Sequence, residues 1–442
     1  MRNSGPLVYL VDDDDAVRDS LGLLLRSIGL ECQLYASALE FLEHYDPKRH
    51  ACLVADIRMP GLSGLELQQR LNEQSAEIPI IFITGHGDVP MAVNAMKAGA
   101  TDFIQKPFRD QDLIDRINQA LETDRSNRDG LREQDEIRRR MGQLTPRERE
   151  VLAAIADQSQ RLLAVGQPTL VEIELAELLT ERVPGIDMIR FSNSGSEGVL
   201  MGLRAAKAFT GRPKVAKVEG AYHGNADPIE VSVAPSPKDW GEASAPATVA
   251  ATQGITDGVL QDTVVLPFND VAASRALIEH HRHELAVVVV DPVVSRMGFV
   301  QATRDYLEML REVTERHGIL LMFDEVFSFR LGYHGAQGEV GVIPDITSLG
   351  KIIGGGLPVG ATGGRADVME VFDQTRKPLR VEHGGTYNAN PMTMAAGLAA
   401  MRQMTPDAYA RLSALGDRLR DGITAAMRDN GLPGRVHGVA SM

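Results

Sequence analysis

Between residues 7 and 121, short apolar runs alternate with stretches whose apolar side chains recur every three or four positions. Short apolar runs predict buried strands, and the periodic stretches predict amphipathic helices. This alternation is typical of a parallel sheet covered by helices. The expected strands are Leu7–Val11, Ala51–Ala55, Ile78–Thr84 and Asp102–Gln105, and the expected helices are Ala16–Ile28, Gly64–Asn72, Pro90–Ala98 and Gln111–Leu121.

A second alternating pattern begins near Leu162 and continues almost to the last residue. Between the two patterns, Glu122–Arg140 is mostly charged, which predicts a solvated helix or a linker. The chain is therefore expected to hold two α/β units in series. The expected strands of the second unit are Met188–Ser192, Val215–Val218, Val264–Pro267, Leu285–Val290, Ile319–Phe323 and Ile346–Ser348.

Composition narrows the class of protein. The 442 residues include 46 Lys and Arg against 60 Asp and Glu, a formal net charge of −14 that disfavours binding to polyanions. Two cysteines, Cys32 and Cys52, are too few for a disulfide framework and fit a reducing compartment. Apolar runs such as Leu285–Val290 are far shorter than the ~20 residues that cross a bilayer, and no signal-peptide core precedes the acidic run near the N-terminus. We expect a cytoplasmic globular protein without a membrane partner.

Charged or hydroxyl-bearing side chains lie at the ends of the strands of the first unit. The first strand ends in Asp12–Asp15, the second expected strand is followed by Asp56, the third ends at Thr84, and the fourth leads into Lys106 and Pro107. Carboxyl ends of parallel strands meet at one edge, so the carboxylates would repel one another without a hard cation such as Mg²⁺. Lys106 would neutralise phosphate charge, and Pro107 suits a turn with a cis bond. An isolated acidic run is usually a solvated turn, but four strand ends in this order favour a phosphoryl site.

Residues 5–125 resemble a response-regulator receiver domain, and the segment 84–93, TGHGDVPMAV, resembles the FixJ-type branch. The resemblance implies a flavodoxin-like fold, phosphorylation within a phosphorelay, and a sensor histidine kinase as partner. It assigns Asp56 as phosphoacceptor and Thr84 and Lys106 as ligands of the phosphoryl oxygens. His86 is interpreted as a loop residue. The implied Mg²⁺ site comprises Asp13 and Asp56 as direct ligands, Asp12 as an outer acidic partner, and the backbone carbonyl of Arg58.

A helix is expected to begin after the charged stretch. Thr145 fits the N-cap, Pro146 the first turn, and Glu148 the third position of a capping box. This start resembles the opening helix of a LuxR-type helix-turn-helix, but the match stops near Ala156. No second helix with a basic face follows, so nothing is expected to enter a major groove. We do not expect DNA binding.

The second unit combines groups that pyridoxal phosphate chemistry requires. Such chemistry needs a lysine that forms an imine, and a carboxylate that holds the ring nitrogen protonated. Lys351 follows a strand and precedes Gly354–Gly356, while Asp324 ends another apolar strand. Each alone is ordinarily a loop cation or a helix cap. Three further segments offer phosphate-binding turns or a stacking aromatic, namely Phe191–Glu197, Gly220–Gly224 and His383–Pro391.

Together these motifs resemble the class III (ornithine- or omega-type) aminotransferase family, in its glutamate-1-semialdehyde 2,1-aminomutase branch, over residues 162–442. The resemblance implies pyridoxal 5'-phosphate as cofactor, an amino-acid or amino-aldehyde substrate, and a homodimer. It assigns Lys351 as the imine-forming base, Asp324 as partner of the pyridinium, and Tyr222 and Val326 as groups on opposite faces of the ring. The remaining implied cofactor contacts are Ser194, Gly195 and Ser196 at the phosphate, His223 beside the cofactor, and Gly385 and Thr386 from the neighbouring subunit.

The expected architecture is a flavodoxin-like receiver domain at 1–125, a charged linker with an incomplete helix-turn-helix at 126–160, and a fold type I pyridoxal-phosphate large domain at 161–442. The second unit is expected to be truncated at both ends, which would remove part of its substrate pocket. Two interpretations therefore stay open. One is an aminotransferase or aminomutase fused to a phosphoacceptor. The other is a phosphorelay response regulator whose second domain is catalytically inert.

Overall fold

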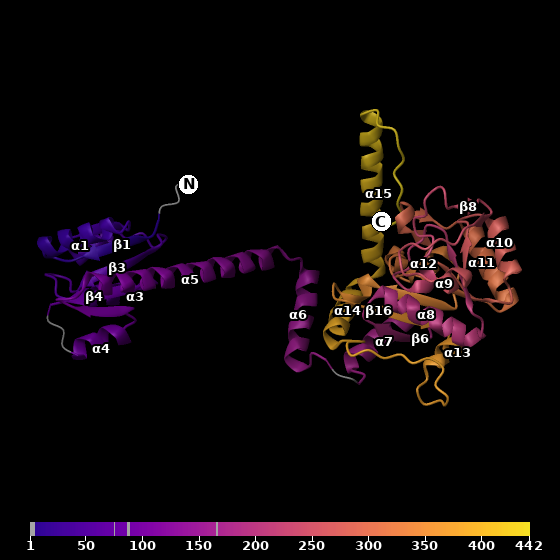
Figure 1. The fold of residues 1–442 in the computed structure, drawn as a ribbon, viewed down its shortest axis with the longest axis horizontal. Coiled ribbons are helices and arrows are strands. Elements are labelled where there is room, and N and C mark those ends of the chain that lie inside the picture. Colours follow the sequence, from indigo (N-terminus) through magenta and orange to yellow (C-terminus); the bar gives the residue numbers. More distant parts are fainter. Residues whose placement is uncertain (1–4, 75, 86–88, 165–166) are drawn as a thin grey trace. The chain divides into compact units, whose positions relative to one another are not determined.

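The structure is a computed structural model that describes residues 5–74, 76–85, 89–164 and 167–442. The chain divides into two compact units, Met1–Gln143 and Leu144–Met442 (Figure 1). Among the described helices, none has the length and apolar character that crossing a membrane requires.

The first unit is a five-stranded parallel sheet in the order β2-β1-β3-β4-β5. The four strands expected from the sequence are confirmed. A further strand, β2, and the helix after it were not predicted, because β2 lies at the sheet edge, where its residues alternate between exposed and half-buried and only Tyr35 is buried. The elements are β1 (Leu7–Val11), α1 (Asp15–Ser27), β2 (Glu31–Tyr35), α2 (Ala38–His44), β3 (Ala51–Asp56), α3 (Gly64–Glu73), β4 (Ile80–Thr84), α4 (Val89–Lys97), β5 (Asp102–Gln105) and α5 (Asp110–Gln143).

Apolar side chains cover both faces of this sheet, which is why its central strands are continuous hydrophobic runs. In β1, Leu7, Tyr9 and Val11 belong to one buried cluster, and Val8 and Leu10 belong to the cluster on the opposite face. Because successive side chains of a strand alternate between faces, the strand direction then fixes the carboxyl edge where the charged residues lie. The charged stretch after residue 121 is helical, since α5 continues to Gln143.

The second unit is built on a seven-stranded sheet in the order β10-β7-β11-β14-β15-β16-β6. The strands from β10 to β15 run parallel, while β16 is antiparallel to both of its neighbours. All six expected strands are present. The strand bounds are β6 (Met188–Ser192), β7 (Lys214–Val218), β10 (Thr263–Leu266), β11 (Leu285–Val290), β14 (Leu320–Asp324), β15 (Ile346–Gly350) and β16 (Gly360–Gly364).

Strand β16 is the one strand of this seven-stranded sheet that sequence patterning missed. Its sequence GATGG has low strand propensity, yet all five residues are buried. A Cβ at Gly360 would lie 1.8 Å from the carbonyl oxygen of Ser194, and one at Gly364 would lie 2.4 Å from that of Asp345. Glycine is therefore required by close backbone approach.

Helices pack on both faces of the second sheet (Figure 1). The central strand β11 is fully buried, and alternate residues contribute to two different hydrophobic clusters. The helices are α6 (Pro146–Arg161), α7 (Leu170–Arg182), α8 (Gly195–Thr210), α9 (Asp257–Gln261), α10 (Val271–His280), α11 (Arg304–His317), α12 (Gly335–Val340), α13 (Ala366–Met369), α14 (Pro391–Gln403) and α15 (Pro406–Asp429). Short strands lie at β8 (Gly241–Glu242), β9 (Ala245–Pro246), β12 (Val293–Val294) and β13 (Val300–Gln301), and 3₁₀ turns lie at Asp227–Ile229, Ser295–Met297, Ser328–Leu331, Lys351–Gly354 and Glu370–Phe372.

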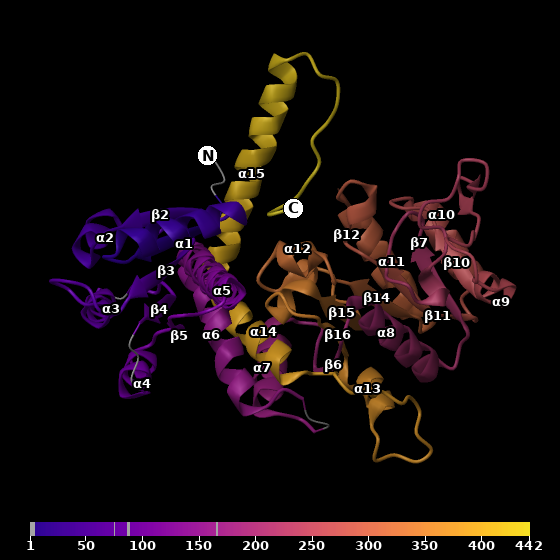
Figure 2. The same ribbon diagram turned by 60° about the vertical axis from the view of Figure 1, so that its left-hand side comes forward.

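The helix expected from Thr145 onward is confirmed as α6, with both reciprocal hydrogen bonds of the capping box. Helix α6 packs against α14 within the second unit (Figure 1). At the other end of this unit, the segment after α15 turns back along that helix (Figure 2). Arg420 fixes this return by donating to the carbonyl oxygens of Ala440 at 2.9 Å and Met442 at 2.8 Å.

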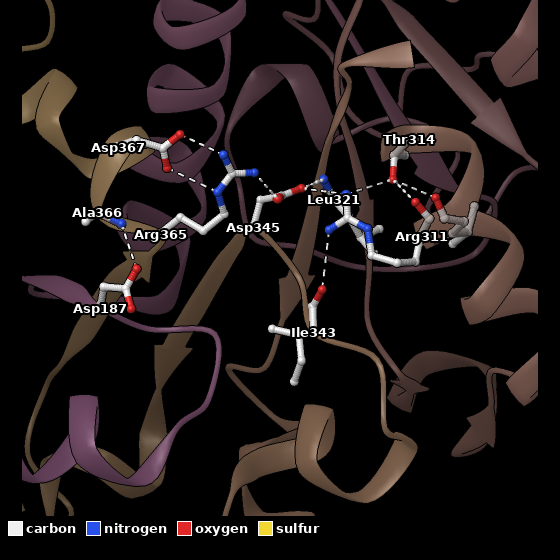
Figure 3. Close-up of polar contacts among 10 residues, drawn as sticks. Asp187, Arg311, Thr314, Leu321, Ile343, Asp345, Arg365, Ala366 and Asp367 are labelled. Atoms are coloured by element: carbon white, nitrogen blue, oxygen red, sulfur yellow. Dashed lines mark hydrogen bonds and ion pairs between the residues drawn. The ribbon is translucent and has the colours of Figure 1, made fainter. Parts of the chain in front are cut away.

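A buried carboxylate joins three structural elements at the amino end of β15 (Figure 3). Asp345 accepts from the Leu321 amide at 2.8 Å, from Arg311 Nη2 at 3.0 Å and from Arg365 Nη1 at 2.6 Å. Arg365 also binds Asp367 through two hydrogen bonds. The network therefore ties β14, α11 and the residue after β16 together, at the opposite end of β15 from Lys351.

Candidate cofactor site and phosphoryl-acceptor site

The two catalytic candidates of the second unit lie at the carboxyl ends of neighbouring strands. Asp324 is the last residue of β14 and pairs in register with Ser348 of β15, and Lys351 follows directly after β15. Lys351 has a φ of 48°, in the left-handed region that non-glycine residues rarely adopt. Local strain of this kind is concentrated at functional sites.

Three donors hold the carboxylate of Asp324. His223 Nδ1 lies 2.8 Å from Oδ2, while Ser348 Oγ and the Val326 amide each lie 3.1 Å from Oδ1. We assign the His223 proton to Nδ1, because an ionised carboxylate can only accept. His223 Nε2 is fully buried and has no partner among the described residues. The histidine thus orients Asp324.

A cavity of about 390 Å³ unites most of the expected cofactor residues. Its walls include eight of the ten expected cofactor contacts; only Gly385 and Thr386 are missing. The expected residues that line it are Ser194, Gly195, Ser196, Tyr222, His223, Asp324, Val326 and Lys351. The lining residues that sequence reasoning did not assign are Asn193, Val199, Gly224, Asp291, Ser295, Phe327, Leu357, Pro358 and Val359.

One wall of this cavity is the start of α8. Ser194 caps the helix by accepting from the Glu197 amide at 3.2 Å, which leaves Gly195 and Ser196 in the first turn. The free amides and the dipole of a helix start favour an anion. A Cβ at Gly195 would lie 2.6 Å from Val326 Cγ1, so glycine lets this turn approach the residue after Asp324. The turn therefore fits a phosphate group.

Two aromatic rings flank the reactive groups. Tyr222 is 40% exposed, and its hydroxyl donates to Asn225 Oδ1 at 2.5 Å. The guanidinium of Arg296 lies 4.5 Å from the Tyr222 ring centroid, and Lys351 Nζ lies 5.4 Å from that of Phe327. A flat face near an amine and a buried carboxylate fits an aromatic cofactor. Phe327 follows Val326 directly, and its place shortly after a strand end was only a partial signal, because the path of the turn decides whether the ring reaches the cavity.

The structure places Gly385 and Thr386 outside this cavity. Gly385 lines a second cavity with Arg190 and His383, and Thr386 is exposed. A hydrogen bond from Asn193 Nδ2 to Asn388 Oδ1, at 2.8 Å, connects their loop to the lining of the first cavity.

Buried carboxyl groups near the cavity have raised pKa values. Burial, followed by the charge of Asp324, raises the pKa of Asp291 well above its usual range. Burial raises the pKa of Glu325 to about 7, although Gln337 and the Ala336 amide oppose the shift. Glu325 accepts hydrogen bonds from both and lies outside the cavity lining, which indicates a structural role.

In the first unit, a lysine joins two of the expected carboxylates. Lys106 Nζ lies 2.9 Å from Asp12 Oδ2 and 2.9 Å from Asp56 Oδ2. Burial raises the pKa of Asp12, although Lys106 and the Asp14 amide oppose the shift. Burial alone would lower the pKa of Lys106, but both carboxylates together raise it. The Asp12 side chain is 2% exposed, against 23% for Lys106, so burial has the larger effect on the pKa of Asp12.

The other receiver candidates surround this cluster. The Arg58 amide donates to Asp56 Oδ1 at 3.0 Å, Thr84 is buried at the end of β4, and Asp13 is exposed. The expected cis bond is present between Lys106 and Pro107. His86 lies outside the described residues. Within the described part of the chain, no three His, Cys, Asp or Glu side chains form a ready metal site, and the Lys106 ammonium supplies the positive charge between the carboxylates.

Comparison with known proteins identifies both units. A sequence model of aminotransferase class-III matches residues 141–442, and one of the response regulator receiver domain matches residues 8–118. The chain belongs to the class III aminotransferase family, with the fold type I architecture of pyridoxal-phosphate enzymes, and carries a receiver domain before it. The family match includes the residues of α6 that resemble a LuxR-type start.

Several relatives are glutamate-1-semialdehyde 2,1-aminomutases. The chain is 40% identical over 293 residues to glutamate-1-semialdehyde 2,1-aminomutase 2 of Bacillus pumilus, covering 66% of each chain. It is 39% identical over 278 residues to the glutamate-1-semialdehyde 2,1-aminomutase of Bacillus subtilis, covering 63% of this chain and 62% of the relative. The chain thus spans about two thirds of the length of these curated relatives.

Solved structures show the same fold. An omega-transaminase from Sphaerobacter thermophilus is 50% identical, with a TM-score of 0.64 and 66% of each chain covered. A transaminase with pyridoxal phosphate bound is 40% identical, with a TM-score of 0.62 and coverage of 66% of this chain and 67% of that one.

Proposed function

We propose that the second unit is a pyridoxal 5'-phosphate-dependent aminotransferase or aminomutase acting on an amino acid or amino aldehyde. The observation that carries this proposal is the meeting of Lys351, Asp324 and the α8 start in one cavity. A lysine amine, a buried carboxylate and an anion-binding turn match the carbonyl, ring nitrogen and phosphate of that cofactor. Its relatives include transaminases and glutamate-1-semialdehyde 2,1-aminomutases.

Each residue has a distinct part in this proposal. When bound, the cofactor supplies an electron sink for bond cleavage beside the amine. Lys351 Nζ binds the cofactor carbonyl and moves protons at the substrate carbon, and Asp324 holds a proton on the ring nitrogen. Tyr222 and Val326 pack against opposite ring faces. The phosphate is bound by Ser194, Gly195 and Ser196, with Gly385 and Thr386 added by the second subunit of a homodimer.

Cofactor binding by the full chain tests this proposal. Purified protein should take up pyridoxal 5'-phosphate and gain the visible absorbance of the lysine-bound cofactor. Lys351→Ala should abolish that absorbance, because the described lining of the cavity holds no second lysine. Lys238→Ala, which removes an exposed lysine outside this lining, is the control.

Turnover is a separate measurement. Addition of glutamate-1-semialdehyde, or of another amino donor, should bleach the visible absorbance of the loaded wild type as the amino group is exchanged. A wild type that acquires no visible absorbance would overturn the proposal. A loaded protein that no amino donor bleaches would support the alternative of an inert domain.

A second function rests on the first unit. We propose that Asp56 accepts a phosphoryl group from a sensor histidine kinase in the cytoplasm, with Mg²⁺ bound by Asp13, Asp56 and the Arg58 carbonyl and with Asp12 as an outer acidic partner. The bonds from Lys106 to both Asp12 and Asp56 support it, because the lysine would neutralise the charge of an incoming phosphoryl group, to which the Thr84 hydroxyl would donate a hydrogen bond.

A small-molecule phosphodonor with Mg²⁺ should phosphorylate the full chain. Asp56→Asn should abolish labelling, whereas Asp19→Asn, which alters an exposed carboxylate on α1, should not. Labelling that persists in Asp56→Asn, or that does not require Mg²⁺, would contradict the proposal.

A further inference from the structure

A second carboxyl group lies beside Asp324 at the cofactor cavity. Strands β11 and β14 are parallel neighbours, and Val290 pairs in register with Phe323. Asp291 and Asp324 are the next residues on the two strands, so both leave the sheet at the same edge. Each is 5% exposed, and both line the cavity of about 390 Å³.

The surroundings of the two carboxyl groups differ. Asp324 has the three donors described above, which stabilise its ionised form. Asp291 Oδ1 accepts one backbone hydrogen bond, from the Val293 amide at 3.0 Å. The Ser328 hydroxyl donates to the Asp324 carbonyl oxygen at 3.3 Å and also bonds the Asp291 side chain, so Ser328 and the Val293 amide oppose the rise in the pKa of Asp291 without cancelling it. The side chain of Asp291 itself lines the cavity.

Electrostatics favour a single negative charge on the pair. Two carboxylates at adjacent strand ends in a buried site repel one another, so the second to ionise does so with difficulty. Burial and the charge of Asp324 accordingly raise the pKa of Asp291. His223, Ser348 and the Val326 amide all donate to Asp324, so these hydrogen bonds favour the negative charge on Asp324 over one on Asp291.

We propose that Asp291 is a further cofactor-binding residue that holds a proton at neutral pH and donates a hydrogen bond from Oδ2 to an electron-rich oxygen of the ligand in this cavity. Asp324 and Asp291 then present one acceptor and one donor side by side. The pair suits an aromatic ligand that bears a protonated nitrogen and an oxygen, and pyridoxal 5'-phosphate has both in its ring nitrogen and ring hydroxyl. The ligand half of this inference rests on the proposed function, whereas the protonation of Asp291 does not.

The pH dependence of unfolding of the full chain without cofactor tests the protonation. A carboxyl whose folded-state pKa is raised binds more protons in the native than in the unfolded state, so it lowers stability as pH rises above about 4. Asp291→Asn removes this effect. Its stability relative to wild type should increase between pH 5 and pH 8, by up to about tenfold in the unfolding equilibrium per pH unit. Asp239→Asn, an exposed change of equal charge, should show no such trend.

Cofactor affinity tests the donor. Asp291→Ala should weaken binding of pyridoxal 5'-phosphate about tenfold, the loss expected for one hydrogen bond in a buried site. Binding of 3-deoxypyridoxal 5'-phosphate, which lacks the ring oxygen, should weaken much less. Asp291→Asn, whose amide is a neutral donor of similar size, should restore most of the affinity for the natural cofactor.

The outcomes separate the parts of the inference. A pH-independent stability difference between Asp291→Asn and wild type would overturn the protonation. Equal losses for the two cofactors in Asp291→Ala would overturn the donor role. A wild type that binds no pyridoxal 5'-phosphate would overturn both the proposed function and the ligand half, while the unfolding experiment would still decide whether Asp291 holds a proton.

Discussion

The carboxylate of Asp345 is predicted to be a major source of stability in the second unit, and Asp345→Ala measures it. The side chain is 4% exposed and bonds the Leu321 amide and the guanidinium groups of Arg311 and Arg365 (Figure 3). The variant leaves a buried amide without an acceptor, at a cost of about 1–3 kcal/mol.

The ion pairs of Asp345 with Arg311 and Arg365 stabilise the fold less than fully buried ion pairs would. Their side chains are 23% and 46% exposed, so solvent screens both ion pairs. Complete loss of a buried ion pair by removing one partner costs about 3–5 kcal/mol. With the arginines discounted, we expect Asp345→Ala to lower the free energy of unfolding by about 3 kcal/mol.

Urea unfolding of the full chain, followed by far-ultraviolet circular dichroism, provides the measurement. The matched control is Glu370→Ala, which removes a carboxylate paired with Arg376 at 2.6 Å, where the side chains are 48% and 53% exposed. An exposed pair contributes about 0–1 kcal/mol. A cost for Asp345→Ala no larger than that of Glu370→Ala would refute the argument from burial. Because Asp345 lies at the opposite end of β15 from Lys351, a variant that remains folded should still bind cofactor.

Two further predictions concern close packing and a buried amine. Gly195→Ala should weaken binding of pyridoxal 5'-phosphate, because its Cβ would lie 2.6 Å from Val326 Cγ1. In an equilibrium titration the double variant with Val326→Ala should bind more tightly than Gly195→Ala alone, although it lacks one ring contact; no gain would contradict the steric account. Burial lowers the pKa of Lys217 to about 7. Between about pH 7 and 10 this lysine therefore binds fewer protons in the native than in the unfolded chain, so the free energy of unfolding should rise with pH over that range. Lys217→Met, compared with wild type in denaturant titrations at pH 7 and pH 9.5, should lose this component of the pH dependence, and an unchanged dependence would refute it.

The sequence predicted those parts of the fold that follow from hydrophobic burial on both sides of a sheet. The run Leu285–Val290 is wholly buried as β11, as its apolar character requires. Patterning failed for β2, where edge exposure weakens the apolar signal, and for β16, where contact between backbones replaces side-chain packing. Neither cause is visible in local sequence, because both depend on which strands lie alongside.

The candidate site was predictable where a residue type and its place at a strand end coincide. Lys351, Asp324 and Lys106 satisfy both conditions. The position of Asp291 after β11 carried the same signal, but its role depends on the donors around Asp324, which only the fold brings together. Phe327 reaches the cavity through the turn after β14, whose path the sequence did not define.

The glycine strand β16 has a consequence for which changes the second unit can tolerate. It is the strand that joins β6, which leads into the phosphate-binding turn, to β15, which leads into Lys351. Its Gly360 has no room for a methyl group beside Ser194, whose side chain caps that turn. A saturation mutagenesis scan of cofactor binding should therefore find Gly360 nearly as intolerant as Lys351. Sensitivity to substitution would then extend to a residue without any side chain. The spacing of the backbones of β15, β16 and β6 sets the distance between the Lys351 amine and the phosphate-binding turn.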